Sequence, residues 1–359
     1  MKRTHFEALR PVCPRCRAKG RTASLDLVDV APGESDDVLQ GRLVCSDPGC
    51  FQEYPILDGI PIIVPDVRSY VADHHPHLLQ RDDLSPLVES LIGDCCGPGA
   101  LFNASREHLS SYTSSHYGDL DPKRDMAEDA SMLQLLERGL ELAGDVPEGA
   151  AVDVGCAVGR STFALAERRK GLVLGVDLSF SMLRVAAAAL REGVVRYPRR
   201  RLGLVYERRE FSVNLAGAER VDFWCCDALA LPFADGSFAL ASSLNVLDCV
   251  SSPRDHLVNL AQVLAPGGKA LIATPYDWSP GATPVESWLG GHSQRGEPGG
   301  SSEETLRALL TDGAHPAFVP GLRITAEAPD VPWSVRIHDR HTAKFSVHLA
   351  VAESVQVSS

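Results

Sequence analysis

The stretch that decides the fold of this 359-residue chain is GAAVDVGCAVGRSTFALAERRKGLVLGVD, residues 149–177. An apolar run (AVDVG) leads into a glycine-rich turn, then into a segment with apolar residues at helical spacing, and then into a second apolar run (LVLGVD). This order predicts a strand, a helix and a second, parallel strand, which is the repeating unit of a doubly wound α/β sheet.

The glycine-rich turn, D-V-G-C-A-V-G-R, indicates which ligand the sheet binds. A dinucleotide enzyme would show G-x-G-x-x-G, with a pyrophosphate on the helix N-terminus. Here Asp153 precedes Gly155 by two residues, and a carboxylate there suits an ammonium group rather than a pyrophosphate. The turn resembles that of class I S-adenosylmethionine (SAM) methyltransferases. The resemblance implies that Gly155, Cys156 and Gly159 let the backbone approach the nucleoside, while Asp153 organises the methionine end.

Two further acids follow predicted strands. Asp177, with Leu178 after it, ends the second strand 24 residues after Asp153, the position that binds ribose hydroxyls in such sheets. The run RVDFWCCDALALPFADGSFALA supplies a third strand that ends in Asp227, placed for the adenine amino group with Ala228 beside the ring. Strands four and five follow, and the family pattern implies a seven-stranded Rossmann-like sheet whose last strand is antiparallel.

The amino-terminal part carries four cysteines at ligand spacing, Cys13 and Cys16 in C-x2-C and Cys45 and Cys50 in C-x4-C. Both pairs lie in turn-rich sequence with strand-like sequence between them, which predicts a structural zinc ribbon, with redox thiols as the alternative. Residues 10–66 resemble the zinc-ribbon domains that accompany certain RNA methyltransferases. The resemblance implies an accessory module, because four Cys ligands leave zinc no open position for water.

We therefore predict a zinc-ribbon domain at residues 1–66, a linker at 67–110 with one short helix, and a methyltransferase domain at 111–359. Residues 121–144 have the apolar spacing of a helix, and the Arg-rich run at 196–210 has the composition of a solvated face. The net charge of -12 argues against a protein built to grip phosphate backbones. We find no apolar run that would span a bilayer and no secretory signal, so we expect a cytoplasmic protein without a membrane partner.

The substrate side is expected at the carboxyl ends of the strands. After strand four the sequence has Asn245 and Asp248 but no N-P-P-Y motif, which disfavours exocyclic amines of nucleobases. After strand five comes TPYDWSPGATPVESWLGG (residues 274–291), rich in proline and aromatic residues. The last two predicted strands flank the basic segment RIHDRHTAK (residues 336–344).

Residues 112–359 resemble a particular group, the mercaptohistidine N-methyltransferase domain of ovothiol-pathway enzymes. The shared features are Tyr112, His116, Tyr117 and Gly118 in an S-x-x-x-H-Y-G context, D-x-G-C-A-V-G-R, N-x-x-D after strand four, P-Y-x-W…T-P…W-L-G-G, and D-x-P-[WF]-x-x-R-x-H-x-R. Two departures matter. The iron-dependent oxygenase half of those enzymes is replaced here by the predicted zinc ribbon, and Cys249 stands where the family has Arg.

The resemblance implies a SAM-dependent N-methyltransferase acting on the imidazole of a small histidine-type substrate, such as histidine or mercaptohistidine. The candidate proton acceptors are Asp248, Asp277 and His338. Arg336 and Arg340 are candidates for holding a substrate carboxylate. The remaining candidate substrate contacts are Tyr117, Asn245 (also placed for the cofactor), Tyr276, Trp278 and Trp288.

Three alternatives stay open. The chain could be an RNA or protein methyltransferase whose ribbon recognises the macromolecule; the acidic charge counts against nucleic acid, and the ribbon counts for a nucleic-acid or protein partner. It could also be a SAM-binding module without turnover, or an enzyme that methylates oxygen or sulfur of another small molecule.

Overall fold

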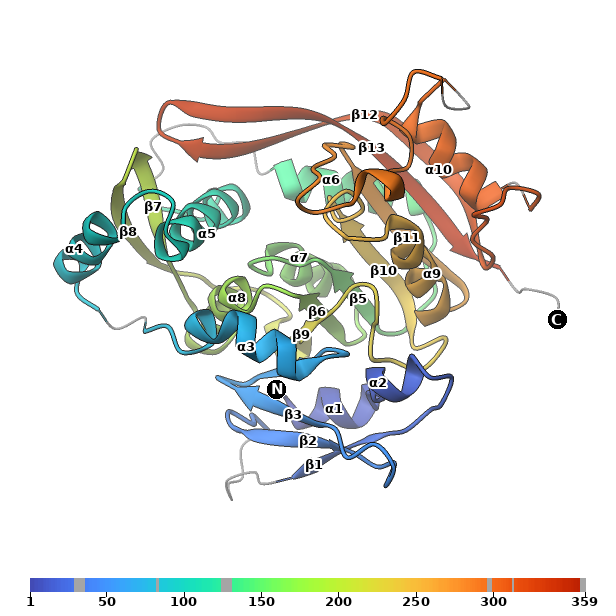
Figure 1. The fold of residues 1–359 in the computed structure, drawn as a ribbon, viewed down its shortest axis with the longest axis horizontal. Helices are drawn as coiled ribbons and strands as arrows, with labels where there is room; N and C mark the ends of the chain where they lie inside the picture. Colours follow the sequence, from blue (N-terminus) through green and yellow to red (C-terminus); the bar gives the residue numbers. More distant parts are fainter. Residues whose placement is uncertain (29–35, 82–83, 124–130, 296–298, 312, 356–359) are drawn as a thin grey trace.

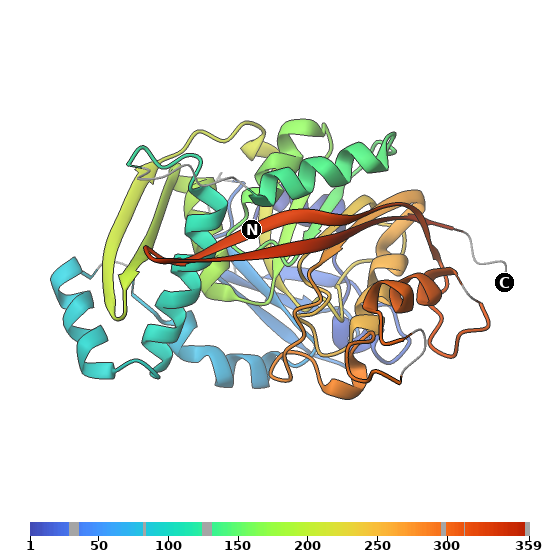
Figure 2. The same cartoon turned by 90° about the horizontal axis from the view of Figure 1, so that it is seen from above.

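The computed structural model describes residues 1–28, 36–81, 84–123, 131–295, 299–311 and 313–355. A large mixed sheet runs through the molecule and helices cover it, and the long hairpin of the last two strands lies at one edge of this sheet (Figures 1 and 2). In the described part of the chain this sheet has eleven strands, in the order β1-β2-β3-β4-β9-β6-β5-β10-β11-β13-β12.

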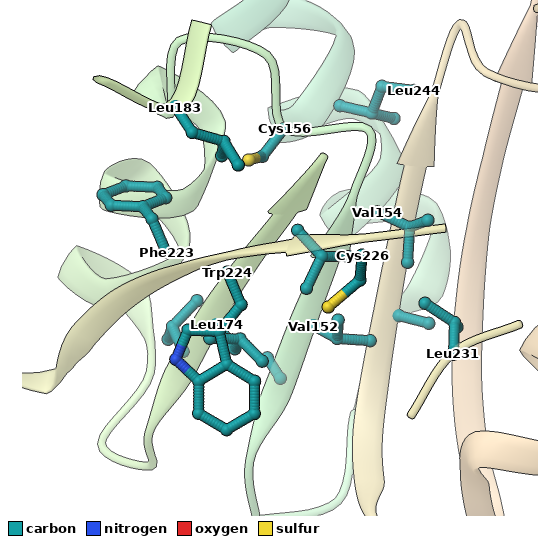
Figure 3. Close-up of a cluster of buried hydrophobic side chains, with 14 of the residues drawn as sticks. Val152, Val154, Cys156, Leu174, Leu183, Phe223, Trp224, Cys226, Leu231 and Leu244 are labelled. Atoms are coloured by element: carbon teal, nitrogen blue, oxygen red, sulfur yellow. The ribbon is translucent and has the colours of Figure 1, made fainter. Parts of the chain in front are cut away.

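The centre of the sheet is parallel and buried. Its five parallel strands are β9 (Val221–Cys226), β6 (Val173–Asp177), β5 (Ala151–Val154), β10 (Phe238–Leu244) and β11 (Leu264–Thr274). Every residue of β5, β9 and β10 is buried, as expected for strands covered on both faces. Figure 3 shows part of this core, where Val152, Leu174 and Trp224 come from three neighbouring strands. The helices that connect or cover these strands are α6 (Ser131–Ala143), α7 (Arg160–Arg168), α8 (Phe180–Glu192) and α9 (Pro253–Val263).

One edge of the sheet is closed by the carboxy-terminal hairpin. β13 (His341–Ser354) is antiparallel to both β11 and β12 (Leu322–His338). Between β11 and β12 lie a short 3-10 helix, η2 (Val285–Ser287), and α10 (Ser302–Thr311). The predicted helix at 121–144 is present from residue 131 onward as α6, and its residues 124–130 lie outside the described residues.

The other edge of the sheet is extended by the amino-terminal segment, so the sheet has eleven described strands where the sequence predicted seven. After α1 (Arg3–Leu9) and α2 (Pro14–Arg17), an antiparallel set is formed by β1 (Leu25–Val28), β2 (Gly41–Cys45), β3 (Glu53–Leu57) and β4 (Ile60–Ile63). β4 then pairs in parallel with β9, Ile62 opposite Cys225. All four residues of β4 are buried. The cysteine-bearing segment therefore continues the sheet instead of standing apart from it. Residues 29–35, which follow β1, lie outside the described residues.

The predicted linker with one short helix is wrong. Residues 67–110 contain α3 (Val67–Leu78), α4 (Pro86–Cys96) and the first half of α5 (Leu101–Tyr117). The side chains of Asp66 and Ser85 cap the first two helices by accepting backbone N–H bonds from Ser69 and Val88. These caps could have been predicted from the sequence. No helix in the described part of the chain is long and apolar enough to cross a membrane.

The prediction that residues 196–210 form a solvated face is also wrong. They form a separate hairpin of β7 (Val194–Leu202) and β8 (Val205–Ser212), and a 3-10 helix, η1 (Ala218–Arg220), follows it. Arg199 and Arg209 are buried, because Arg209 pairs with Asp121 and Arg199 pairs with Asp339 at 3.0 Å. Asp339 lies at the turn of the β12–β13 hairpin, so the tip of that hairpin reaches the β7–β8 hairpin (Figure 1).

Candidate active site

The glycine-rich turn between β5 and α7 is fixed by Asp153. This carboxylate is buried and accepts hydrogen bonds from Ser161 Oγ (2.6 Å) and Thr162 Oγ1 (2.7 Å) at the start of α7. Burial raises the pKa of Asp153 above its usual value. Both of these partners belong to the chain itself, so the structure gives Asp153 the role of holding the turn against the helix.

Two positions in this turn require glycine. Gly155 has φ +74° and Gly159 has φ +84°, the left-handed region that side chains rarely adopt. A Cβ on Gly155 would overlap the Val246 side chain, and one on Gly159 would lie 2.6 Å from the Phe223 ring. Cys156 between them is buried. Val246 follows β10. The glycine-rich turn between β5 and α7, called the cofactor turn below, therefore packs directly against the loop that leads to Asp248.

Two of the predicted cofactor acids end adjacent strands. Asp177 Oδ2 accepts the Ala157 N–H at 2.8 Å and its Oδ1 accepts the Ser179 N–H at 2.7 Å, while burial raises its pKa. Asp227 follows β9, the neighbour of β6, and accepts the Leu229 N–H at 2.9 Å.

The hydrophobic neighbours predicted beside these acids differ in exposure. Leu178 is 44% exposed, and its carbonyl accepts the Tyr70 hydroxyl at 2.7 Å. Ala228 is half-buried. The carboxyl ends of β6 and β9 thus place two acids and a solvent-accessible apolar side chain side by side, as a nucleoside site requires.

Asn245 stands out at the carboxyl end of β10. Its φ is +58°, and its backbone N–H bonds to Ala273 O at 2.8 Å. Both its amide nitrogen and its amide oxygen are buried without a hydrogen-bond partner. A buried, unpaired amide costs about 1–3 kcal/mol for each unsatisfied group. A ligand that offers one donor and one acceptor here would remove that cost.

Asp248 lies three residues further along the same loop and is buried. Its Oδ2 accepts the Asp277 N–H at 2.7 Å, and its Oδ1 lies 4.0 Å from the Cys249 thiol, a weak donor. Burial, together with the nearby charge of Asp277, raises the pKa of Asp248. A desolvated carboxylate with a raised pKa is suited to accept a proton. Asp277 itself is exposed.

The segment after β11, residues 274–291, is built into the structure by side-chain bonds. Tyr276, at φ +55°, bonds through its hydroxyl to His348 Nδ1 at 2.7 Å, and His348 Nε2 bonds to Glu327 at 2.9 Å. The rings of Trp278 and Trp288 stack with centroids 5.9 Å apart. Their indole N–H groups donate to Ser302 Oγ (3.2 Å) and Thr283 O (2.8 Å) respectively. The segment is therefore an ordered aromatic wall, and Asp277 joins it to Asp248.

Helix α5 contributes two tyrosines with different surroundings. Tyr117 is fully buried and donates its hydroxyl to Val158 O at 2.8 Å, so it supports the cofactor turn from the core. Tyr112 is half-buried, and burial together with the charges of Cys249, Asp177 and Asp248 raises its pKa to about 12. Tyr112 is thus within electrostatic range of Asp177 and Asp248. The sequence assigned it no role, although its place four residues before His116 in Y-T-S-S-H-Y-G could have suggested one.

The predicted residues of the β12–β13 hairpin lie near its tip. Arg336 bonds to Asp339 at 3.1 Å, and its backbone N–H donates to Ser115 Oγ at 3.3 Å. Arg340 is exposed, and its backbone N–H donates to His338 Nδ1 at 3.2 Å. The structure brings Arg336 to helix α5 and to the arginines of β7, whereas the bonds of His338 and Arg340 at the tip do not connect them to Asp248 or Asp277.

The four predicted metal ligands do come together. The Sγ atoms of Cys13, Cys16, Cys45 and Cys50 lie within 4.8 Å of one another. Two of the separations are 3.9 Å (Cys13–Cys50) and 3.7 Å (Cys16–Cys45). Four thiolates at about 2.3 Å from a tetrahedral zinc would be about 3.8 Å apart. The donor set and its spacing fit that ion.

Comparison with known proteins supports the class that the fold and site define. The family model described as "Methyltransferase domain" matches residues 152–272. The matched residues contain the glycine-rich turn, the two acids predicted to bind ribose and adenine (Asp177 and Asp227), Asn245 and Asp248. Over residues 152–272 the chain is therefore similar to methyltransferase domains.

Among the relatives, an O-methyltransferase (cnsE) of Penicillium expansum is 29% identical over 56% of this chain and 64% of its own length. The methyltransferase GfsG of Streptomyces halstedii is 32% identical over 51% of this chain and 63% of its own. The chain thus spans less than two thirds of these relatives. A solved structure, Haemonchus contortus phosphoethanolamine N-methyltransferase 2 with phosphomonomethylethanolamine and S-adenosylhomocysteine, is 20% identical, covering 48% of this chain and 34% of its own, with a TM-score of 0.35.

Proposed function

We propose that this protein transfers a methyl group from SAM to an imidazole nitrogen of a small, histidine-type molecule. The observation that carries the proposal is the juxtaposition at the carboxyl ends of β10 and β11. There the buried Asp248 carboxylate, the unpaired amide of Asn245 and the aromatic wall around Tyr276 belong to one connected loop pair. A flat ring with one N–H donor and one lone pair matches such a site.

SAM supplies an activated methyl group on a sulfonium. The residues proposed to hold it are those of the cofactor turn and the strand ends, with Asp177 for the ribose hydroxyls and Asp227 for the adenine. The turn can approach the ligand closely because Gly155 and Gly159 have no side chain. Asp153 acts through its bonds to α7, which keep the turn in shape.

The chain's own contribution to chemistry is to orient the acceptor and to take one proton. When an imidazole nitrogen forms a bond to the methyl carbon, the carbon–sulfur bond breaks and its electron pair leaves on sulfur. The ring becomes cationic, and its other N–H becomes more acidic. In the proposal Asp248 Oδ1 faces that N–H and accepts the proton, because burial gives this carboxylate a raised pKa. Asp277 and His338 remain the alternative acceptors.

The relatives raise a different possibility for the atom that receives the methyl group. One relative is named an O-methyltransferase, and another is a demethylmenaquinone methyltransferase. A hydroxyl acceptor could use the same Asp248, because it too releases one proton. The two acceptors are separated by a direct product analysis.

The test is an assay with methyl-labelled SAM against histidine, mercaptohistidine, a phenol and total RNA. We expect label on an imidazole nitrogen, located by NMR of the product. Asp248→Asn should lose transfer, while Asp235→Asn, which changes an acid with an 82% exposed side chain, should not. Label on the phenol oxygen or on RNA, with none on either imidazole, would overturn the proposal.

The alternative is a macromolecular substrate, and the four-cysteine cluster favours it because a zinc ribbon is a common recognition module. We propose that this cluster holds one structural zinc ion, with Cys13, Cys16, Cys45 and Cys50 as ligands. The ion would have no open coordination position, so it would take no part in methyl transfer. Sheet order places the ribbon strands at the edge opposite the β12–β13 hairpin. RNA binding through it would weaken steeply as salt is raised, whereas transfer to a small molecule would hardly respond.

A further inference from the structure

A cavity outside the candidate active site is rich in arginine. It lies among α4, α5, α8 and the β7–β8 hairpin, elements that stand together on one side of the sheet (Figure 1). Of thirteen lining residues five are arginines and one is an acid, Glu89. The arginines are Arg81, Arg106, Arg184, Arg196 and Arg208. Such an excess of positive charge in a concave site concentrates anions.

Arg106 is the most unusual member of this lining. Only 4% of its surface is exposed, and its guanidinium lies over the rings of Tyr206 (4.0 Å) and Phe102 (5.3 Å). Its Nη1 donates to Asn103 Oδ1 at 3.3 Å, and its Nε is buried with no partner. In the described parts of the chain no carboxylate forms an ion pair with it. A buried guanidinium with a single long bond to a neutral group lacks the counter-charge that buried cations normally have.

The lining acid does not supply that counter-charge, because Glu89 is bonded to Arg208 at 3.0 Å. Two other lining arginines are paired with acids outside the cavity lining, Arg196 with Glu210 (2.7 Å) and Arg184 with Asp58 (3.4 Å). Burial lowers the pKa of Arg106, although the nearby charge of Glu89 opposes this. The positive charge of Arg106 is therefore not balanced by an ion pair with any described residue.

The rest of the lining is suited to an organic group. Leu109, Val185 and Ala188 are apolar, and Ser181 and Tyr197 add two hydroxyls. A ligand that fits both halves has an anionic head and an apolar body. Arginine forks bind carboxylates and phosphates through two parallel hydrogen bonds.

We propose that this cavity binds a small organic anion, with a carboxylate or a phosphate monoester held by Arg106 and Arg184. This site goes beyond the methyl-transfer site, since it contains none of the cofactor or acceptor residues. Two helices connect the two sites. Tyr112 follows Leu109 by one turn on α5, and Ser181 follows the Asp177-bonded Ser179 at the start of α8.

The experiment is calorimetric titration of the full chain at constant ionic strength in chloride, without SAM or methyl acceptor. The probes are inorganic phosphate, phenyl phosphate, acetate and benzoate, so that the head group and the apolar body are tested separately. We expect saturable binding of one phenyl phosphate or benzoate per chain. Comparing phenyl phosphate with benzoate also distinguishes a phosphate ligand from a carboxylate ligand.

Arg106→Met keeps much of the side-chain volume without the charge, and Arg184→Met alters a partly exposed residue that does not hold the core together. Each should weaken binding about 10- to 100-fold, the effect of losing hydrogen bonds to a charged group. Arg138→Met, which changes an exposed arginine on α6 paired with Glu141, should bind like the unmodified chain.

Two outcomes would overturn the inference: no saturable binding of any of the four anions, or undiminished binding by both Arg106→Met and Arg184→Met. Because SAM and acceptor are absent, neither outcome bears on methyl transfer. A failure of methyl transfer would likewise leave the anion titration unaffected.

Discussion

Gly155→Ala tests whether the cofactor turn and the acceptor loop are coupled through direct packing. The new methyl group would meet Val246 Cγ2, and the φ of +74° would strain any side chain. The strain costs about 1–2 kcal/mol, and overpacking adds about 1–3 kcal/mol. We therefore expect the free energy of unfolding to fall by roughly 2–5 kcal/mol.

The two contributions can be separated with matched variants. Gly267 has φ +75°, and no atom lies within 4 Å of the position that its Cβ would take, so Gly267→Ala should show the strain alone, about 1–2 kcal/mol. Val246→Ala removes both γ carbons and leaves only its Cβ, at 3.5 Å from the new methyl. In that background Gly155→Ala should also cost only the strain, which gives a coupling energy of about 1–3 kcal/mol.

The assay is urea unfolding of the four variants, followed by SAM titration of each. We expect Val246→Ala to remove the overpacking part of the destabilisation in the Gly155→Ala protein, while the strain of the left-handed φ remains. An additive double mutant would refute the packing argument. Full SAM affinity in Gly155→Ala would refute the assignment of this turn to the cofactor.

Three further predictions concern individual side chains. Asp248→Asn should lower kcat about 10²–10⁴-fold, as expected for loss of a proton acceptor. In the unmodified protein kcat should fall as the pH drops through the raised pKa of Asp248, because protonation removes the acceptor. A pH–rate profile in which both proteins lose activity at the same acidic pH would contradict this role. Asp248→Asn should also raise the melting temperature at neutral pH. An ionised acid whose pKa is higher in the folded than in the unfolded protein destabilises the fold at every pH above its unfolded-state pKa, and the amide does not ionise. Tyr117→Phe should cost about 1–3 kcal/mol of stability by leaving the buried Val158 carbonyl without its donor, and unchanged urea unfolding would contradict that. Zinc analysis should find one ion per chain and none in Cys16→Ser; a fully stable, zinc-free chain would exclude the structural zinc.

The cofactor half of the fold was predictable because its signals are local. Parallel strands buried on both faces read as unbroken apolar runs, and Asp177 and Asp227 end such runs directly. The need for glycine at position 155 likewise arises within one short turn. The same holds for the two cysteine pairs, because the spacing within each pair is local. That the two pairs lie together is known only from the structure.

The features that sequence reasoning missed depend on contacts between distant segments. Arg199 and Arg209 lie in charged runs of β7 and β8, and the acids that they pair with while buried, Asp339 and Asp121, are far away in the chain. The hydrogen-bonded chain from Tyr276 through His348 to Glu327 joins three strands or loops in the same way. A single sequence does not indicate such pairings, because a charged side chain is expected to be exposed unless its buried partner of opposite charge is known.

The pairing of β4 with β9 imposes an order of events on synthesis. Ile62 and its partner Cys225 are separated by more than 150 residues, which a ribosome adds in roughly 8–33 s at 5–20 residues per second. During that interval the IPII strand has left the ribosome while the strand that covers its edge does not yet exist. An apolar strand with an open edge is a site for unwanted pairing. Nascent chains of this protein should therefore need protection until β9 emerges, and slower translation of the intervening residues should lower the yield of soluble protein.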